Sequence, residues 1–438
     1  MMSTLLSPLS GSEVSPWFAR APLAAEATSA QAAAWERFQR LPDPQRTDED
    51  WRFADLSKAR LSGYQLAPAE EDDLEAITRA REEGPADAAA RFVFVNNRLV
   101  HAERGALPPA AVCLEINEAI RLHGDRVATG GAPGRVHLGG EKFAALHEAA
   151  TKSGIYLHLP AGCVVEKPIL VHHFVGGEGS AIFPHLLVEA EANASATVCE
   201  IFASLGDSEK TITLSEVELT ARGGGAVQHV TLQVLDEAQA KFVQLHRGQA
   251  GRDARIKSAS VHLGAAWVRT ESINTMMDRG ADCQIYSASL ANEKQEIDQR
   301  TLQAHRAQHT TSDLLFKNAL YDDARTIFSG LIDVEEGAHH TDSYQKCRHL
   351  LGSERAEANA MPGLEINADQ VKCSHGATSG QISDEEIFYL QARGIPAHLA
   401  RQMISLGFLN EVIGKLDGEE VKAMLFARVE AKFAGVVE

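Results

Sequence analysis

Apolar residues follow a helical spacing over the first third of the chain. They recur every three or four positions in Leu23–Leu41, Glu70–Glu83 and Phe143–Ala149, a spacing that places apolar side chains on one face of a helix. A strand interrupts this pattern, because Phe92–Val95 is a run of aromatic and β-branched residues followed by an Asn-Asn turn. We therefore predict a mainly helical N-terminal region over residues 1–150.

Between residues 151 and 380 the period of the apolar pattern shifts towards two. Pairs such as Val217/Leu219 and Val243/Leu245 mark short strands separated by Gly, Asn and Asp turns. No regular helix separates these strands, which argues against a doubly wound sheet or a TIM barrel. A sandwich, a barrel and a β-solenoid remain open. No strict repeat is visible, but the lack of Asn-Gly or Asp-Gly hairpin turns favours a solenoid.

The chain from residue 381 to residue 438 is helical again. Ser383 and Glu386 have the spacing of a capping box, so a helix should begin there. Further on, an apolar stripe at every fourth position could pack within the chain or bind a partner: Val421, Leu425, Val429 and Phe433. The ends of a solenoid need caps, and helical regions at both ends would provide them.

Composition and charge exclude several classes of function. The 438 residues are 44% hydrophobic and 23% charged, as in an ordinary globular chain of two or three domains. Lys and Arg total 42 against 60 Asp and Glu, and this net charge of −18 argues against sequence-independent binding to nucleic acid. No apolar run approaches the ~18 residues of a membrane span, and no basic residue precedes Arg20. We therefore expect a cytoplasmic protein.

Signatures of catalysis are missing from the sequence. No Walker A pattern, G-x-S-x-G elbow or H-E-x-x-H motif is present, so the chain has no signature for hydrolysing nucleotides or esters itself. The six cysteines are far apart and include no Cys-x-x-Cys pair, so no disulfide framework is predicted. Most of them should be small core hydrophobes.

The candidate chemistry lies in the stretch Gly363–Gln381. Here Val371, Cys373 and His375 sit at i, i+2 and i+4, and in a strand all three side chains share one face. The thiol and the imidazole are then roughly 6.6 Å apart at their bases, since a strand rises about 3.3 Å per residue. The small residues from Gly376 onward should end the strand before the helix that Ser383 begins.

Three interpretations of this Cys-x-His pair remain open. A second pair, Cys347-Arg348-His349, could combine with Cys373 and His375 as a tetrahedral zinc set, although zinc ligands are usually two to four residues apart. A Cys-His nucleophile would need an orienting third group and a pocket, and neither is evident. Ordinary packing is the third interpretation.

Several stretches of the chain resemble the SufD family of the SUF iron–sulfur cluster assembly system, which is related to SufB. The matching stretches are NALYDDARTIFSGLIDV (Asn318–Val334), PGLEINADQVKCSHGATSGQI (Pro362–Ile382), EEIFYLQARGIP (Glu385–Pro396), LGFLNEVI (Leu406–Ile413) and, near the N-terminus, EDWRFADL (Glu49–Leu56). Within the last of these, we expect Trp51 to pack the domain.

The resemblance implies a fold, partners and ligands. The fold would be a right-handed parallel β-helix over residues 151–380, flanked by helical regions at residues 1–150 and 381–438. A SufB-like subunit would bind the end of the β-helix, and a SufC-like ATPase would bind the C-terminal helices. His375, with Cys373 beside it, would be a ligand to transient iron or an iron–sulfur cluster at the SufB interface.

From this resemblance we expect a non-enzymatic scaffold subunit with no tightly bound cofactor when it is alone. A stand-alone zinc- or thiol-dependent enzyme on a β-helix is the alternative. Self-association is also open, because the exposed end of a solenoid could pair with a second copy.

Overall fold

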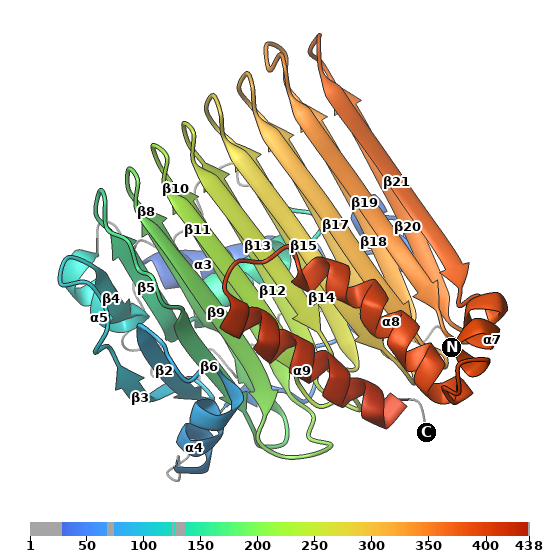
Figure 1. The fold of residues 1–438 in the computed structure, drawn as a ribbon. Coiled ribbons are helices and arrows are strands. Elements are labelled where there is room, and N and C mark those ends of the chain that lie inside the picture. The colour runs from blue at the N-terminus through green and yellow to red at the C-terminus, as the bar shows by residue number, and fades with distance from the viewer. Residues whose placement is uncertain (1–28, 68–73, 125–126, 128–135, 437–438) are drawn as a thin grey trace, which may run out of the picture.

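The computed structural model describes residues 29–67, 74–124, 127 and 136–436. Most of its strands form two facing sheets, and from β8 to β19 successive strands alternate between them, so that each pairs in parallel with the strand two positions further along the chain (Figure 1). This arrangement is a parallel β-solenoid of about eight turns. The predicted mainly-β solenoid with helices at both termini is confirmed.

We call the two sheets A and B. Sheet A contains β1 (Gln65–Leu66), β4 (Val112–Glu115), β5 (Ser153–Leu159), β7 (Ser180–Ile182), β8 (Pro184–Ala190), β10 (Ile212–Ala221), β12 (Lys241–Ala250), β14 (Trp267–Met276), β16 (Glu296–His305), β18 (Arg325–Val334) and β20 (Glu357–Ile366). Sheet B contains β2 (Ala90–Val95), β3 (Arg98–Glu103), β6 (Ile169–Val175), β9 (Ser195–Ser204), β11 (Ala226–Val234), β13 (Arg255–His262), β15 (Asp282–Ala291), β17 (Thr311–Leu320), β19 (Asp342–Leu351) and β21 (Lys372–Gln381).

The turns of the solenoid differ in length, which explains why no strict repeat is visible in the sequence. Trp267 pairs with Lys241, 26 residues earlier, whereas Glu357 pairs with Arg325, 32 residues earlier. The strands stay in register because the connecting loops absorb the difference. A periodic sequence motif is therefore not needed for a periodic backbone.

The N-terminal region supplies strands as well as helices. Its helical elements are α3 (Ser29–Arg40), the 3-10 turn η1 (Glu49–Trp51), α4 (Leu74–Glu83), α5 (Ile116–His123) and α6 (Glu141–Ala150). The predicted strand at Phe92–Val95 is β2, which pairs with β6 in parallel and with β3 in an antiparallel hairpin. β4 likewise pairs antiparallel with β5. Sheets A and B therefore both end in antiparallel strands on this side.

Trp51 fixes the N-terminal segment to the outer face of sheet A. It is 2% exposed, and its indole Nε1 donates a hydrogen bond to the Gly139 carbonyl at 3.0 Å. The guanidinium of Arg269 lies 3.8 Å from the centre of the Trp51 ring and donates to Asp298 at 2.6 Å. The expectation that Trp51 packs the domain is confirmed.

Three helices follow the last strand: α7 (Asp384–Gln391), α8 (Ala397–Ile413) and α9 (Glu419–Val436). The predicted capping box is present, since the Ser383 hydroxyl accepts a hydrogen bond from the Glu386 amide at 3.4 Å. α8 and α9 lie across the outer face of sheet B (Figure 1). The apolar stripe is at most 2% exposed and packs there beside Leu290 and Leu315, so the stripe is internal packing.

At the C-terminal end of the solenoid, the expectation that helices cap it is wrong. α8 and α9 fold back along sheet B because the outer face of that sheet is apolar and matches their stripe. The last strands, β20 and β21, are left largely exposed. Among the described residues, none of the helices has the length and apolar character needed to cross a membrane.

Truncating the stripe should destabilise the fold. Leu425→Ala removes a fully buried side chain between α9 and sheet B, so we expect the free energy of unfolding to fall by about 2–5 kcal/mol. The matched control is Leu399→Ala on α8, where the side chain is 41% exposed and the change should be about 0.5 kcal/mol or less. Urea denaturation measures both. Equal losses in the two variants would contradict this packing.

Candidate functional site at the open end of the solenoid

The C-terminal end of the solenoid is its most exposed part. Within the described residues, β20 pairs only with β18 in sheet A, and β21 pairs only with β19 in sheet B. Each of these ten-residue strands therefore presents one row of backbone N–H and C=O groups without a neighbouring strand. We call the free edges of β20 and β21 the open rim. Such edges pair readily with strands of another chain.

Cys373 and His375 lie on β21 at the open rim, on the same face of the strand as predicted. They pair in register with Ser343 and Gln345 of β19, which are buried inside the solenoid. Because paired residues in a parallel sheet share a face, both side chains point towards the mouth of the solenoid. His375 is exposed and Cys373 is half-buried, so a second molecule can reach both.

The predicted end of the strand near Gly376 is wrong. β21 continues to Gln381, and the segment Gly376–Gln381 keeps full register with β19. Backbone pairing with β19 overrides the low strand propensity of these small residues. These residues therefore extend the open rim rather than ending it.

Burial and the charge of Asp342 raise the pKa of the Cys373 thiol above its ordinary value. The side chain packs partly against an apolar cluster that includes Ile332, Val334 and Ala338. A reactive cysteine needs a lowered pKa, so this environment does not favour a nucleophile. A metal or cluster that binds the sulfur would displace the proton instead.

The second Cys-x-His pair does not join the first. Cys347 and His349 are buried inside the solenoid, where the Cys347 sulfur lies 3.3 Å from His349 Nε2. In the register of β19 and β21, Cys347 pairs with Ala377, four residues beyond Cys373. That offset is about 13 Å along the strand, so the four side chains do not converge on one zinc ion.

Large apolar side chains accompany the open rim. Leu364 and Ile366 on β20 are 37% and 39% exposed, and Tyr344 on β19 is 39% exposed. Leu364 and Ile366 lie on one of the two strands with an unpaired edge and Tyr344 lies on the strand next to the other, which adds apolar area beside edges already able to pair. Apolar side chains beside a free edge are typical of an interaction surface.

Polar residues inside the solenoid form a second feature, which sequence reasoning missed. The carboxylate of Glu200 is 1% exposed and is held between two imidazoles, His173 Nε2 at 3.2 Å and His229 Nε2 at 2.9 Å. Burial alone would raise the pKa of Glu200, but the hydrogen bonds to these histidines lower it to about 2. The alternation of polar and apolar residues along the strands shows that these polar residues share a face. It does not show that this face is the inner one.

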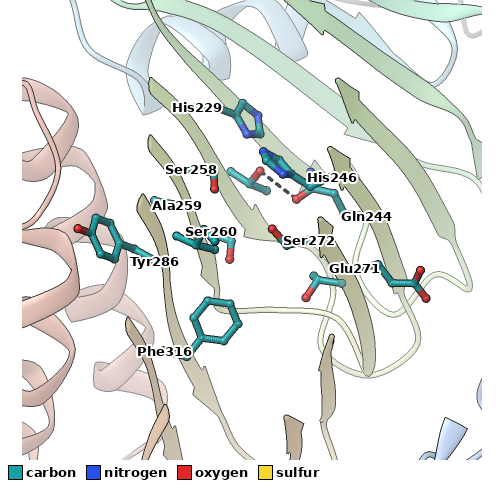
Figure 2. Close-up of a pocket in the computed structure, with 13 residues that line it drawn as sticks. His229, Gln244, His246, Ser258, Ala259, Ser260, Glu271, Ser272, Tyr286 and Phe316 are labelled. Carbon is teal, nitrogen blue, oxygen red and sulfur yellow. Dashed lines mark hydrogen bonds between the residues drawn. The ribbon is translucent and has the colours of Figure 1, made fainter. Parts of the chain in front are cut away.

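A small cavity of about 30 Å³, lined by both polar and apolar side chains, lies next to this group (Figure 2). His246, Gln244 and Ser258 line it, and Figure 2 shows His229 beside His246. The volume holds about two water molecules, too little for an organic substrate. The cavity is therefore a small packing gap rather than an active-site pocket.

Fold and site together define a parallel β-solenoid protein with an open rim that carries a thiol and an imidazole. A family model described as "SUF system FeS cluster assembly, SufBD core domain" matches residues 173–408, more than half of the chain. The chain belongs to this SufBD family.

Its similarity to proteins named SufD extends over nearly its whole length. It is 31% identical to the iron–sulfur cluster assembly protein SufD of Escherichia coli, over 94% of this chain and 95% of that protein. It is also 24% identical to SufD of Bacillus subtilis, over 90% of each chain. A SufBD family protein of Synechocystis is 25% identical over 85% of this chain and 84% of its own. The predicted membership is confirmed.

Acid should weaken the solenoid through its interior histidines. Burial lowers the pKa of His246 and His305 to about 3 and that of His349 to about 4, against an ordinary 6.5. Below pH 6.5 the unfolded chain binds these protons and the folded chain does not, so stability falls as pH drops from about 6.5 to about 4. Each histidine contributes up to about 1.4 kcal/mol per pH unit.

Urea denaturation across that pH window checks this dependence. His246→Gln should reduce the slope of the free energy of unfolding against pH by the equivalent of about one proton, because the glutamine does not titrate. His340→Gln, which changes an exposed histidine, should leave the slope unchanged. A slope that is the same in the wild type and in His246→Gln would contradict the prediction.

Proposed function

We propose that this chain is a non-catalytic scaffold subunit that works in iron–sulfur cluster assembly together with a SufB-like subunit bound at the open rim. In this proposal His375, with Cys373 beside it, supplies ligands to iron or to a nascent cluster at that interface. The observation that carries the proposal is an exposed imidazole on the terminal strand, next to an unpaired backbone edge. Family membership supports the role in cluster assembly.

The ligand count favours a site shared between two subunits. Iron in clusters is held mainly by thiolates, and imidazole replaces them in some sites. One thiol and one imidazole cannot close a four-ligand site, so the remaining ligands must come from another chain or from the cluster itself. The protonated Cys373 thiol would lose its proton only when iron binds, which suits a transient cargo rather than a resident ion.

The partner at the open rim should present strands of its own. Two ten-residue edges can each add a strand by main-chain hydrogen bonds, while Leu364 and Ile366 supply apolar contact. A related solenoid that ends in the same way fits this requirement. Pairing with a second copy of this chain uses the same surface, so a homodimer would compete with the heterocomplex.

A SufC-like ATPase is proposed to bind the C-terminal helices, at a surface different from the apolar stripe. Phe388 and Tyr389 on α7 are 71% and 58% exposed, and Leu399 and Met403 on α8 are 41% and 50% exposed. We call these four residues the helix patch. Leu399 and Met403 are four residues apart and so share one face of α8. The stripe on α9 is already buried against sheet B and is not available to a partner.

The competing proposal, a zinc- or thiol-dependent enzyme, has less support. The two Cys-x-His pairs are out of register, and the pKa of Cys373 is raised rather than lowered. If the purified chain held stoichiometric zinc and the Cys373→Ser variant lost it, the enzyme proposal would gain support.

Replacing the rim imidazole should impair cluster loading. In the reconstituted complex with SufB-like and SufC-like subunits, we expect His375→Ala to lower the iron and sulfide retained per complex several-fold. The reason is that one ligand of a shared site is removed while the backbone edge remains. Metal and sulfide analysis with visible absorbance measures the loading, and size-exclusion chromatography checks assembly.

His340→Ala is the matched control, because it removes an exposed imidazole from the turn before β19 rather than from β21. It should load clusters normally. Normal loading of an intact His375→Ala complex would remove His375 from the mechanism.

Polar substitution in the helix patch should weaken binding of the ATPase partner. A fully buried aromatic or aliphatic side chain contributes about 1.5–3 kcal/mol, so Phe388→Ser and Met403→Ser should each lower the affinity about 10- to 100-fold in a binding titration. Leu74→Ser on α4, where the side chain is 72% exposed, is the control and should bind like the wild type. Equal affinity for all three variants would place the partner elsewhere.

A further inference from the structure

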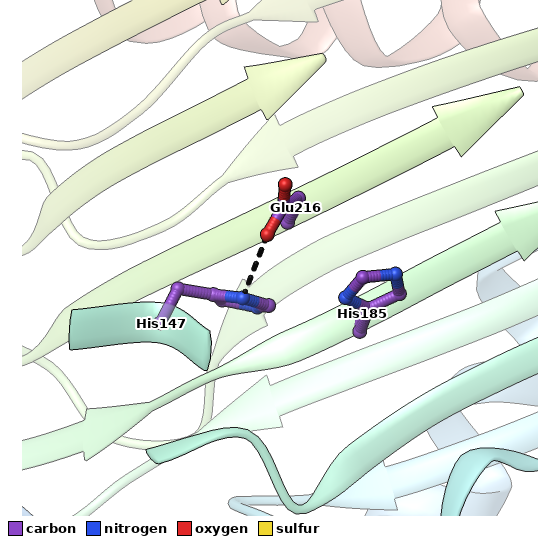
Figure 3. Close-up of side chains that lie close together, drawn as sticks. All are labelled: His147, His185 and Glu216. Atoms are coloured by element: carbon purple, nitrogen blue, oxygen red, sulfur yellow. Dashed lines mark ion pairs between the residues drawn. The ribbon is translucent and has the colours of Figure 1, made fainter. Parts of the chain in front are cut away.

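Three metal-ligating side chains converge far from the open rim, beneath helix α6. His147 lies in the last turn of α6, His185 on β8 and Glu216 on β10, and all three are at most 1% exposed. One donor atom from each lies within 4.8 Å of the other two. Figure 3 shows the three side chains together, with the ion pair between His147 and Glu216 drawn as a dashed line.

The backbone explains why two of the donors meet. His185 and Glu216 are register partners on adjacent parallel strands, so their side chains stand next to each other on the outer face of sheet A. The C-terminal end of α6 lies over this point and brings His147 down onto them. The carbonyl end of a helix favours a positive charge.

The hydrogen-bond partners of His147, the Pro184 carbonyl and the Thr151 hydroxyl, orient its ring. Its Nε2 lies 2.9 Å from the Pro184 carbonyl oxygen, which can only accept, so Nε2 carries a proton and donates it. Its Nδ1 lies 3.1 Å from Glu216 Oε2. A nitrogen lone pair and a carboxylate oxygen repel each other at that distance, so a positive species must lie between them. The Thr151 hydroxyl is also 3.1 Å from Nδ1, but it has the Phe183 carbonyl as a second acceptor.

The surroundings favour a metal ion over a proton shared by His147 and Glu216. An imidazolium–carboxylate pair needs no second imidazole, yet His185 lies with its ring centre 5.4 Å from that of His147. Ligand atoms around a tetrahedral zinc are roughly 3.3 Å apart, given bonds of about 2.0–2.1 Å, and the His147–Glu216 distance is already close to this value.

The groups around the three donors resemble the supporting partners of a metal site. Ligating histidines usually donate their other N–H to a carbonyl or a carboxylate, as His147 does to Pro184. His185 Nε2 lies 3.6 Å from the Glu218 carboxylate, the same kind of partner. Arg247 Nε lies 3.8 Å from the other oxygen of Glu216, Oε1, and so orients the carboxylate.

We propose that His147, His185 and Glu216 bind one divalent transition-metal ion that fastens α6 to sheet A. Two imidazoles and one carboxylate suit zinc and ferrous iron alike. Because the site is fully buried, the ion would enter as α6 docks during folding, and its binding would stabilise the folded state. The site is independent of Cys373 and His375.

The test uses the full chain, unfolded in urea with a chelator, freed of both and refolded with or without one equivalent of Zn²⁺. We expect one tightly held zinc per chain after dialysis and a higher unfolding temperature than in the metal-free chain. Glu216→Gln, which keeps the shape but removes the charge, should bind zinc at least 10-fold more weakly, and His185→Gln likewise. Anaerobic loading with Fe²⁺ distinguishes the two candidate ions, and binding of either one that depends on Glu216 supports the site.

A control variant separates this site from surface histidines. His309 and His340 are stacked in exposed turns with their ring centres 4.6 Å apart and could hold zinc weakly. His340→Asn should leave the tight zinc in place. If zinc binding is lost in His340→Asn, persists in Glu216→Gln, or does not raise the unfolding temperature of the wild type, the buried group is an ordinary ion pair and the proposal is wrong. Comparing the metal-free variants by circular dichroism detects a variant that fails to fold.

Discussion

A strand in a parallel ladder needs a neighbour on each side, and the last strand of a solenoid has only one. This constraint governs the two ends of the molecule differently. At the N-terminal side, β3 and β4 reverse direction and terminate the sheets as antiparallel strands. At the C-terminal side the helices fold back along sheet B, because the apolar stripe of α9 is more favourably buried there than across the rim. The open rim is therefore a consequence of where the apolar surface of the helices lies.

Local patterns in the sequence were enough to identify the elements but not the faces of the strands. The capping box at Ser383 and the strand at Phe92–Val95 depend only on neighbouring residues, and both are present. The apolar alternation has different meanings in different strands. Val217 and Leu219 point into the solenoid, whereas Val230 and Leu232 point out beneath the C-terminal helices. Which face is inside is decided by the packing of both sheets, and a period of two carries no information about it.

The candidate site shows the same division between local and long-range information. The spacing of Cys373 and His375 places them on one face of any strand, so sequence reasoning could pair them. Whether Cys347 and His349 join them depends on the register between β19 and β21, which is set by loops of varying length. His147, His185 and Glu216 lie 31 to 69 residues apart and meet through register and helix docking, so no short motif indicates them. A site whose residues come from different turns of a solenoid can be recognised only once the register between the strands is known.

The connection between β21 and α7 is only two residues long, Ile382 and Ser383. Ile382 is 7% exposed in a small apolar cluster with Ile387 and Ala400, and Ser383 is tied to α7 by its cap. Two residues span at most about 7 Å, so this joint has almost no slack. A force that tilts α7 must therefore pull on the carboxyl end of the strand that carries His375. The helix patch and the open rim are therefore joined through a short connection that leaves little room for independent movement.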